Sequence, residues 1–179
     1  MAKITKKDKM IIKKQLDKEP ENLRAVALRC PQGNPVVLKT SPFSEKNGVF
    51  PTIYWLSCPF YGQHVSRLED QGLVKNLTKK LQQDPEFALR LKEAHNRYAR
   101  ERFNLLNQEQ IAKIKKISLD ILVVLKNSGV GGIRDKKGIK CLHTHLADFL
   151  VNGQNPVGKK VIKKMPDLED CPFQDCDIC

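Results

Sequence analysis

The residues of this chain best suited to chemistry are its six cysteines, which are spread over most of its length. They are Cys30, Cys58, Cys141, Cys171, Cys176 and Cys179. The sequence begins MAKITKKDKM and has no apolar leader segment, so we expect a cytoplasmic protein, and disulfides are rare in that compartment. Cysteines in such a protein usually serve metal binding or redox chemistry. Metal binding requires a fold that brings some of them together.

The densest group of thiols lies in the C-terminal tail, residues 166–179. The chain ends CPFQDCDIC, which spaces three cysteines as C-x4-C-x2-C. This spacing resembles the cluster-binding loop of plant-type ferredoxins, which needs a fourth cysteine from elsewhere in the chain. Three thiols and one distant ligand also make a zinc site. We predict a zinc or iron–sulfur centre that includes the tail, with redox-active thiols as the alternative.

Cys58 lies between a predicted strand and a predicted helix. The residues before it, Ile53-Tyr54-Trp55-Leu56, are apolar or aromatic and too few for a helix, and Pro59 suits the first position of a helix. Unpaired backbone N–H groups at such a helix start favour the thiolate form of cysteine. Cys30 ends another predicted strand, so the two thiols could converge. The alternative is that Cys58 is a small apolar residue buried at a tight corner.

A predicted helix with the sequence KCLHTHLADFL carries a further cysteine and two histidines. Cys141 and His145 are four residues apart and share one helical face, and such a pair can hold a metal ion. His143 points elsewhere on the same helix. We predict Cys30, Cys58 and Cys141 as the core ligands, completed by His143, His145 or a cysteine of the tail. Zinc suits a mixed cysteine and histidine set, and an iron–sulfur cluster suits cysteines alone.

The pattern of apolar residues predicts an α+β fold with a small antiparallel three-stranded sheet near the N-terminus, packed with four to five helices. The strands are expected at residues 22–30, 36–40 and 51–57, and the helices at 5–18, 59–82, 84–103, 108–126 and 140–150. Gly72 could divide the second helix. The chain is thus organised as a basic N-terminal helix at 1–20, a single α+β domain at 21–165 and a cysteine-rich tail at 166–179.

A second hypothesis is an enzyme that acts on a small substrate carrying phosphate or carboxylate. Its pocket would combine His95, Tyr98, Arg67, Glu69 and His143. The arginine would bind the anion and a histidine would move protons. The alternative for Arg67 and Glu69 is a surface or structural ion pair. The sequence has no Ser/His/Asp arrangement, paired carboxylates or nucleotide-binding fingerprint, so an enzymatic activity stays an open question at this point.

The net charge of +12 suggests a third class of function. An excess of lysine and arginine favours polyanions such as nucleic acid, and the alternative is a well-solvated surface. The sequence has no helix-turn-helix, zinc-finger or RNA-recognition signature, and aromatic residues make up only 6%, few for base stacking. The longest aliphatic run, residues 121–125, is too short to span a bilayer, so we expect no membrane association. A basic nucleic-acid-binding or scaffolding protein is therefore the third hypothesis.

Several short motifs occur in an order that resembles a known family. They are Arg29-Cys30-Pro31 with Gly33 and Pro35, Pro51-Thr52-Ile53-Tyr54-Trp55-Leu56 with Ser66-Arg67-Leu68-Glu69, Ala94-His95 with Tyr98, Gly131-Gly132, Lys140-Cys141-Leu142-His143, and Asn155-Pro156 with Gly158. Over roughly residues 20–160 the chain resembles the bacterial family catalogued as domain of unknown function 501. The resemblance implies a candidate site but no reaction, and its pattern does not include His64 or the cysteines of the tail.

Overall fold

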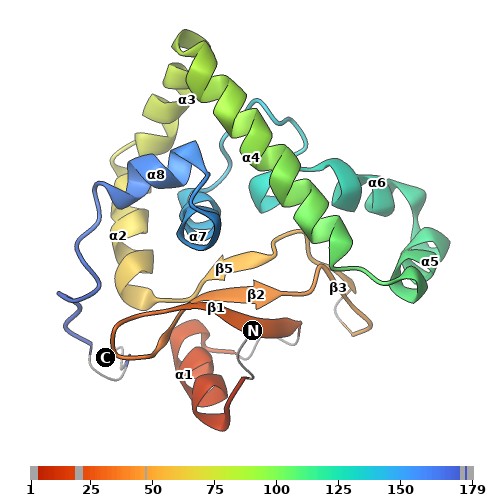
Figure 1. The fold of residues 1–179 in the computed structure, drawn as a ribbon, viewed down its shortest axis with the longest axis horizontal. Coiled ribbons are helices and arrows are strands. Elements are labelled where there is room, and N and C mark those ends of the chain that lie inside the picture. The colour runs from red at the N-terminus through yellow and green to blue at the C-terminus, as the bar shows by residue number, and fades with distance from the viewer. Residues whose placement is uncertain (1–3, 19–21, 47, 174–175, 177–179) are drawn as a thin grey trace.

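A three-stranded antiparallel sheet lies at the centre of the fold (Figure 1). The computed structural model describes residues 4–18, 22–46, 48–173 and 176. β1 (Leu23–Arg29) and β5 (Tyr54–Leu56) flank β2 (Pro35–Thr40), which is buried along its whole length. This arrangement confirms the predicted sheet. A two-stranded hairpin that the prediction lacked, β3 (Phe43–Ser44) with β4 (Gly48–Val49), is inserted between β2 and β5.

The described residues form eight α-helices, more than the four to five predicted. They are α1 (Lys6–Leu16), α2 (Pro59–Asp70), α3 (Leu73–Gln83), α4 (Pro85–Asn104), α5 (Gln108–Ile117), α6 (Leu119–Asn127), α7 (Leu142–Asn152) and α8 (Pro156–Ile162). Two predicted helices are each divided, one at Gly72, whose φ is +79°, and one at Ser118, whose backbone is extended. The eighth helix was not predicted; Asn155 caps it by accepting from the N–H groups of Val157 and Gly158.

Helices cover both faces of the sheet (Figure 1). α1 lies on one face, where Ile11 and Ile12 are buried, and α2, α4, α7 and α8 lie on the other side. α7 contacts β5, α2 and α8, and its residues Leu142, Leu146 and Ala147 have no exposed surface. The main apolar core therefore lies between the sheet and α7, the helix that carries the predicted site residues His143 and His145.

A close approach between α7 and α8 fixes the position of α7. A Cβ atom at Gly158 would overlap the carbonyl oxygen of His145 and the Cβ atom of Phe149. Only glycine fits at this crossing, because every other residue brings a Cβ atom. α8 can therefore pack directly on the backbone of α7.

α4 is 20 residues long and contains several buried polar side chains. Arg102 is fully buried, and its guanidinium donates to the carbonyl groups of Leu125, at 2.8 Å, and Ser128. Both carbonyls lie at the C-terminal end of α6, where the backbone carbonyl groups have no hydrogen-bond partner within the helix. Arg102 thus holds α6 against α4. Neither α4 nor any other helix in the described ranges combines the length and the apolarity needed to cross a membrane.

Candidate metal centre

Three side chains of the types that can bind a metal meet where the start of α7 packs against α2. Glu69 comes from the end of α2, and Cys141 and His143 come from the start of α7. The Glu69 oxygen, the Cys141 sulfur and a His143 nitrogen all lie within 4.8 Å of one another. In the part of the chain that the structure describes, no other group of three or more His, Cys, Asp or Glu side chains is this close.

The thiol and the carboxylate of this group face the same ring nitrogen. His143 Nδ1 lies 3.7 Å from Cys141 Sγ and 3.5 Å from Glu69 Oε1. The other ring nitrogen, Nε2, lies 3.2 Å from the carbonyl oxygen of Gly62 and 3.4 Å from the hydroxyl of Ser66. A carbonyl can only accept a hydrogen bond, so Nε2 carries the proton. The lone pair of Nδ1 faces the thiol and the carboxylate whenever the ring is neutral.

The first turn of α7 positions these groups. The helix begins at Leu142, so Cys141 has an extended backbone, with φ −153° and ψ 127°. The N–H of Leu142, one of the donors left unpaired at a helix start, donates to Glu69 Oε1 at 2.6 Å. The Thr144 hydroxyl donates to the Cys141 carbonyl at 3.1 Å. Backbone contacts therefore anchor Glu69 and Cys141 without the help of a ligand.

Cys141 and His143 alter each other's ionisation. Burial disfavours the Cys141 thiolate, but the hydrogen bond with His143 and one with the Thr144 N–H outweigh it, so the pKa of the thiol lies below its ordinary value. The contact with Cys141 raises the pKa of His143, against the effect of burial. Because a metal binds the thiolate of cysteine and the neutral ring of histidine, this pairing favours Cys141 as a ligand and means that His143 must release a proton if it binds a metal.

Cys58 occupies the N-cap of α2 with Pro59 as the first helical residue, as the sequence analysis expected. Its thiol is buried, however, and burial raises its pKa to about 11. A backbone hydrogen bond from Tyr61 acts in the opposite direction and is the weaker effect. The expected preference for the thiolate is therefore wrong, because desolvation outweighs the helix start.

The other thiols of the described residues, Cys30, Cys171 and Cys176, gather near Cys58. Cys30 and Cys171 pack against the core cluster that contains Cys58. Burial raises the pKa of Cys176, and the neighbouring thiols of Cys30 and Cys171 raise it further. The predicted core set of three cysteines is therefore divided, because its third member belongs to the group at the start of α7. Cys179 lies outside the described residues.

His145 does not pair with Cys141 as the sequence analysis predicted. That prediction assumed that both residues are helical, but α7 begins one residue after Cys141. His145 is fully buried, and its Nδ1 accepts from the side-chain amide of Asn155 at 3.0 Å. Burial, with a smaller effect from His95, lowers its pKa to about 3, so the ring is neutral. His145 is thus part of the core.

Two residues assigned to a substrate pocket have structural contacts instead. His95 Nδ1 accepts from the N–H of Val130 at 3.0 Å, and its Nε2 donates to the carbonyl of Gly138 at 3.2 Å. The Tyr98 hydroxyl accepts from the N–H of Ile53 at 2.8 Å. Both side chains are fully buried in α4, where they hold the loop after α6 and the strand β5.

The remaining three residues of that predicted pocket lie apart from His95 and Tyr98. Arg67 is exposed on α2, whereas Glu69 and His143 contact each other in the group described above. The five residues therefore do not form one pocket, because the α4 members face the core.

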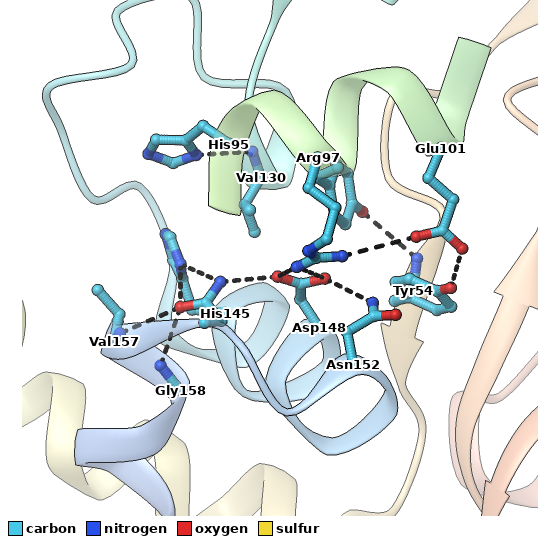
Figure 2. Close-up of polar contacts among 12 residues, drawn as sticks. Tyr54, His95, Arg97, Glu101, Val130, His145, Asp148, Asn152, Val157 and Gly158 are labelled. Atoms are coloured by element: carbon cyan, nitrogen blue, oxygen red, sulfur yellow. Dashed lines mark hydrogen bonds and ion pairs between the residues drawn. The ribbon is translucent and has the colours of Figure 1, made fainter. Parts of the chain in front are cut away.

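A buried polar network that joins α4, α7 and α8 was missed by the sequence analysis (Figure 2). Arg97 donates to both carboxylate oxygens of Asp148, at 2.7 and 2.8 Å, and Asn155 donates to the same carboxylate at 2.8 Å. Glu101 contacts both Arg97 and Tyr54. Asp148 is fully buried. The signal that could have found it is an acid within the apolar sequence of α7, since a buried carboxylate needs a partner.

A basic groove of about 570 Å³ lies between α4 and the start of α8, beside this network. The charged residues that line it are Arg90, Glu93, Arg97, Arg100 and Lys159. The charge of Arg97 is neutralised by an ion pair with Asp148, and that of Arg90 by an ion pair with Glu86. The excess positive charge of the groove therefore comes mainly from its other two cations.

Comparison with known proteins places the chain in a sequence family without a described activity. A family model described as Protein of unknown function (DUF501) matches residues 26–163, which confirms the resemblance seen in the sequence. No curated protein and no solved structure matches the chain. The matched segment contains Glu69, Cys141 and His143, and it ends before the cysteines of the tail.

Proposed function

The chain belongs to the family described as Protein of unknown function (DUF501), and we propose that it is a zinc-binding protein whose ligands are Glu69, Cys141 and His143. One observation carries this proposal: the three donor atoms lie within 4.8 Å of one another. They come from two helices and are 74 positions apart at most, since 143 − 69 = 74. Only the packing of α7 against α2 brings them together.

The distances support a shared metal ion. Two atoms bound at about 2.0–2.3 Å to one tetrahedral zinc ion are about 3.3–3.8 Å apart. His143 Nδ1 lies 3.5 Å from the Glu69 oxygen and 3.7 Å from the Cys141 sulfur. The donors are one sulfur, one nitrogen and one oxygen, a set that zinc accepts, whereas magnesium and calcium take mainly oxygen. Both distances to His143 Nδ1 thus match a shared zinc ion, and the Glu69 and Cys141 donor atoms lie within 4.8 Å of each other.

The same residues could instead form a nucleophilic cysteine activated by histidine. In that arrangement one ring nitrogen takes the proton of the nucleophile, and the other contacts an acid that orients the ring. Here the thiol and the carboxylate both face Nδ1, and Nε2 is engaged by the Gly62 carbonyl. This arrangement supports a metal site over a relay of protons.

Three protein ligands leave a fourth coordination position at zinc for water or an anion. This is the ligand number of catalytic rather than structural zinc sites, and zinc supplies Lewis acidity at such a position. The hydrogen bond from His143 to Gly62 would keep the ring oriented toward the metal. The proposal thus retains the hypothesis of an enzyme with a small anionic substrate, now located at the metal.

Zinc binding is tested by equilibrium dialysis of the reduced, full-length protein. We expect His143→Ala to weaken binding at this site by at least about 100-fold, because losing a ligand costs more than losing its supporting hydrogen bond. The variant then retains one equivalent less zinc per chain than the unmodified protein. His64→Ala is the matched control. His64 lies on α2, the helix that carries Glu69, but its ring nitrogen contacts the Phe60 carbonyl. Equal zinc retention by the two variants would contradict the proposal.

The basic groove supports a second candidate function, the binding of a small phosphate-bearing ligand. Arg97 Nε is buried and has no hydrogen-bond partner within the described residues, and Nη1 has only a 3.6 Å ion pair with Glu101. Arg100 and Lys159 add charge at the same groove. We expect pyrophosphate to bind there and the double variant Arg100→Ala/Lys159→Ala to lower its affinity about tenfold or more, since each loses a charge-assisted contact.

Isothermal titration with pyrophosphate measures this effect. Lys113→Ala is the control, because Lys113 lies on α5 and pairs with Glu45 and Glu109. If the double variant binds pyrophosphate as tightly as the control, the groove is not an anion site.

A further inference from the structure

We infer that Cys30, Cys58, Cys171 and Cys176 form a second metal site, bound through thiolates alone, that fastens the C-terminal tail to the sheet. This site shares no ligand with the group at the start of α7. The inference therefore stands or fails independently of the zinc site proposed above.

Backbone hydrogen bonds to the start of β2 hold Cys30 and Cys58 at the same end of the sheet. The N–H of Cys30 donates to the Asn34 carbonyl at 2.9 Å and closes the turn between β1 and β2. The N–H of Cys58 donates to the Val36 carbonyl at 3.3 Å, where β5 leads into α2. β1 and β5 lie on opposite sides of β2, so these cysteines flank the first residues of one strand.

Gln15 links the tail to that end of β2. Its side-chain amide donates to the Pro35 carbonyl at 2.8 Å and to the Cys176 sulfur at 3.4 Å. Pro35 is the first residue of β2 and lies between the two residues whose carbonyls accept from the other cysteines. The side chain of Asn34 also hydrogen bonds to the Cys176 thiol. Cys176 therefore lies at the same end of β2 as the backbones of Cys30 and Cys58.

Cys171 adds a fourth thiol from the same tail. It packs against the core cluster that contains Cys58. Cys58 and Cys176 each expose only 5% of their surface. Water can hardly stabilise thiolates at such positions, so a cation is the natural partner for them.

The backbone of Cys176 is strained. Its φ is +54°, in the left-handed region that only one other non-glycine residue of the described ranges adopts. A cysteine rarely takes this conformation unless its surroundings hold it there, and such residues are concentrated at binding sites. Here the contact with Gln15 holds the sulfur against the body of the protein.

Four thiolates suit either a zinc ion or an iron–sulfur cluster. Within the described residues no three of these sulfur atoms lie within 4.8 Å of one another. Binding would therefore draw the sulfur atoms closer together. Two of them, Cys171 and Cys176, follow the last described helix, α8, so their positions are not fixed by a helix or a strand.

Titration of the reduced, full-length protein with Co²⁺ tests this site, because thiolate ligands give cobalt a strong near-ultraviolet charge-transfer band. A site with four thiolates should give about four times the band of a site with one. We expect Cys176→Ser and Cys171→Ser to lose most of the band and Cys141→Ser, which alters the other group, to lose only the smaller share. Circular dichroism of each variant checks that the fold is retained.

The metal that the protein carries after anaerobic purification identifies the form of the site. Zinc in a colourless protein supports a single ion, and iron with acid-labile sulfide supports a cluster, provided that either metal is lost in Cys171→Ser and Cys176→Ser. The inference is wrong if the cobalt band corresponds to one thiolate or fewer, or if both tail variants keep the band unchanged. The two tests are independent. If His143→Ala did not affect zinc binding, the cobalt result for the four cysteines would still hold.

Discussion

The two groups of metal-binding side chains differ in what holds them. Glu69, Cys141 and His143 belong to two packed helices, and their donor atoms already lie within 4.8 Å of one another. The thiols near the start of β2 come from a strand end, a helix start and the tail, and they gather without reaching that distance. The proposed ligands on the two packed helices are therefore positioned by folding itself, whereas we propose that a metal completes the group that includes the tail.

Contacts of α7 with α4 and α8 support the first group. α7 is held by the buried carboxylate of Asp148, which binds Arg97 and Asn155, and by the close contact of Gly158 with its backbone. Nothing comparable follows Cys171 in the described part of the chain. The comparison predicts that the two groups respond differently when their supports or their metals are removed.

The largest effect is expected from breaking the network under α7. Asp148→Ala leaves the half-buried Arg97 and the buried Asn155 without their shared partner, and we expect it to lower the free energy of unfolding by about 3–5 kcal/mol. Urea unfolding measures the change. Asp120→Ala, an exposed acid in the first turn of α6, is the control and should cost no more than about 0.5 kcal/mol. Similar costs for both variants would show that the network does not hold α7.

The next effect comes from metal itself. Zinc at about 100 times its dissociation constant should stabilise the folded chain by about 2.7 kcal/mol per site. Hydrogen exchange should then separate the two groups: chelation of the metal should speed exchange in residues 165–173 at least tenfold and leave residues 142–152 nearly unchanged. If chelation instead sped up exchange in α7 and left residues 165–173 unchanged, the proposed difference between the two groups would be wrong.

A smaller effect should follow acidification near the tail site. Arg29, through a hydrogen bond, holds the pKa of the Asp8 carboxyl far below its ordinary value, although burial acts against this. The folded pKa is depressed, so the pair stabilises the protein above pH of about 4 and loses its contribution as the pH falls further. We expect about 1–2 kcal/mol, measured as the difference in unfolding free energy between the unmodified chain and Asp8→Ala from pH 6 to pH 2. A difference that does not shrink with acid would contradict this.

The smallest effect should come from the tail without metal. Cys171 is only half-buried, so Cys171→Ser should change the stability of the metal-free protein by less than about 0.5 kcal/mol. With metal bound, the same change should remove the stabilisation of that site. A large loss in the metal-free chain would mean that the tail is held by packing and not by a metal.

The sequence carried enough local information to predict the sheet, most helix starts and the position of Cys58. Strand patterns and the Pro59 and Asp84-Pro85 helix starts are local signals that tertiary packing did not overturn. The start of α7 was different, because the N–H of Leu142 is bound by Glu69, 73 residues earlier. That contact leaves Cys141 outside the helix, and no pattern within the segment itself indicates it.

The histidines show the same limit. His95 and His145 have the residue type of ligands, yet their burial against backbone groups and Asn155 makes them neutral core residues. Burial depends on which helices pack together, and a single sequence does not contain that information. Glu69 and His143 were each predicted as site residues, but their contact depends on the packing of α2 against α7.

The most direct test of the proposed zinc centre is X-ray absorption at the zinc edge of the double variant Cys171→Ser/Cys176→Ser, loaded with one equivalent of zinc. Removing both tail thiols leaves the group at the start of α7 as the zinc site. We predict one sulfur ligand at about 2.3 Å together with nitrogen and oxygen ligands at about 2.0–2.2 Å. A spectrum without sulfur, or a protein that does not retain zinc, would contradict the assignment of Glu69, Cys141 and His143 as its ligands.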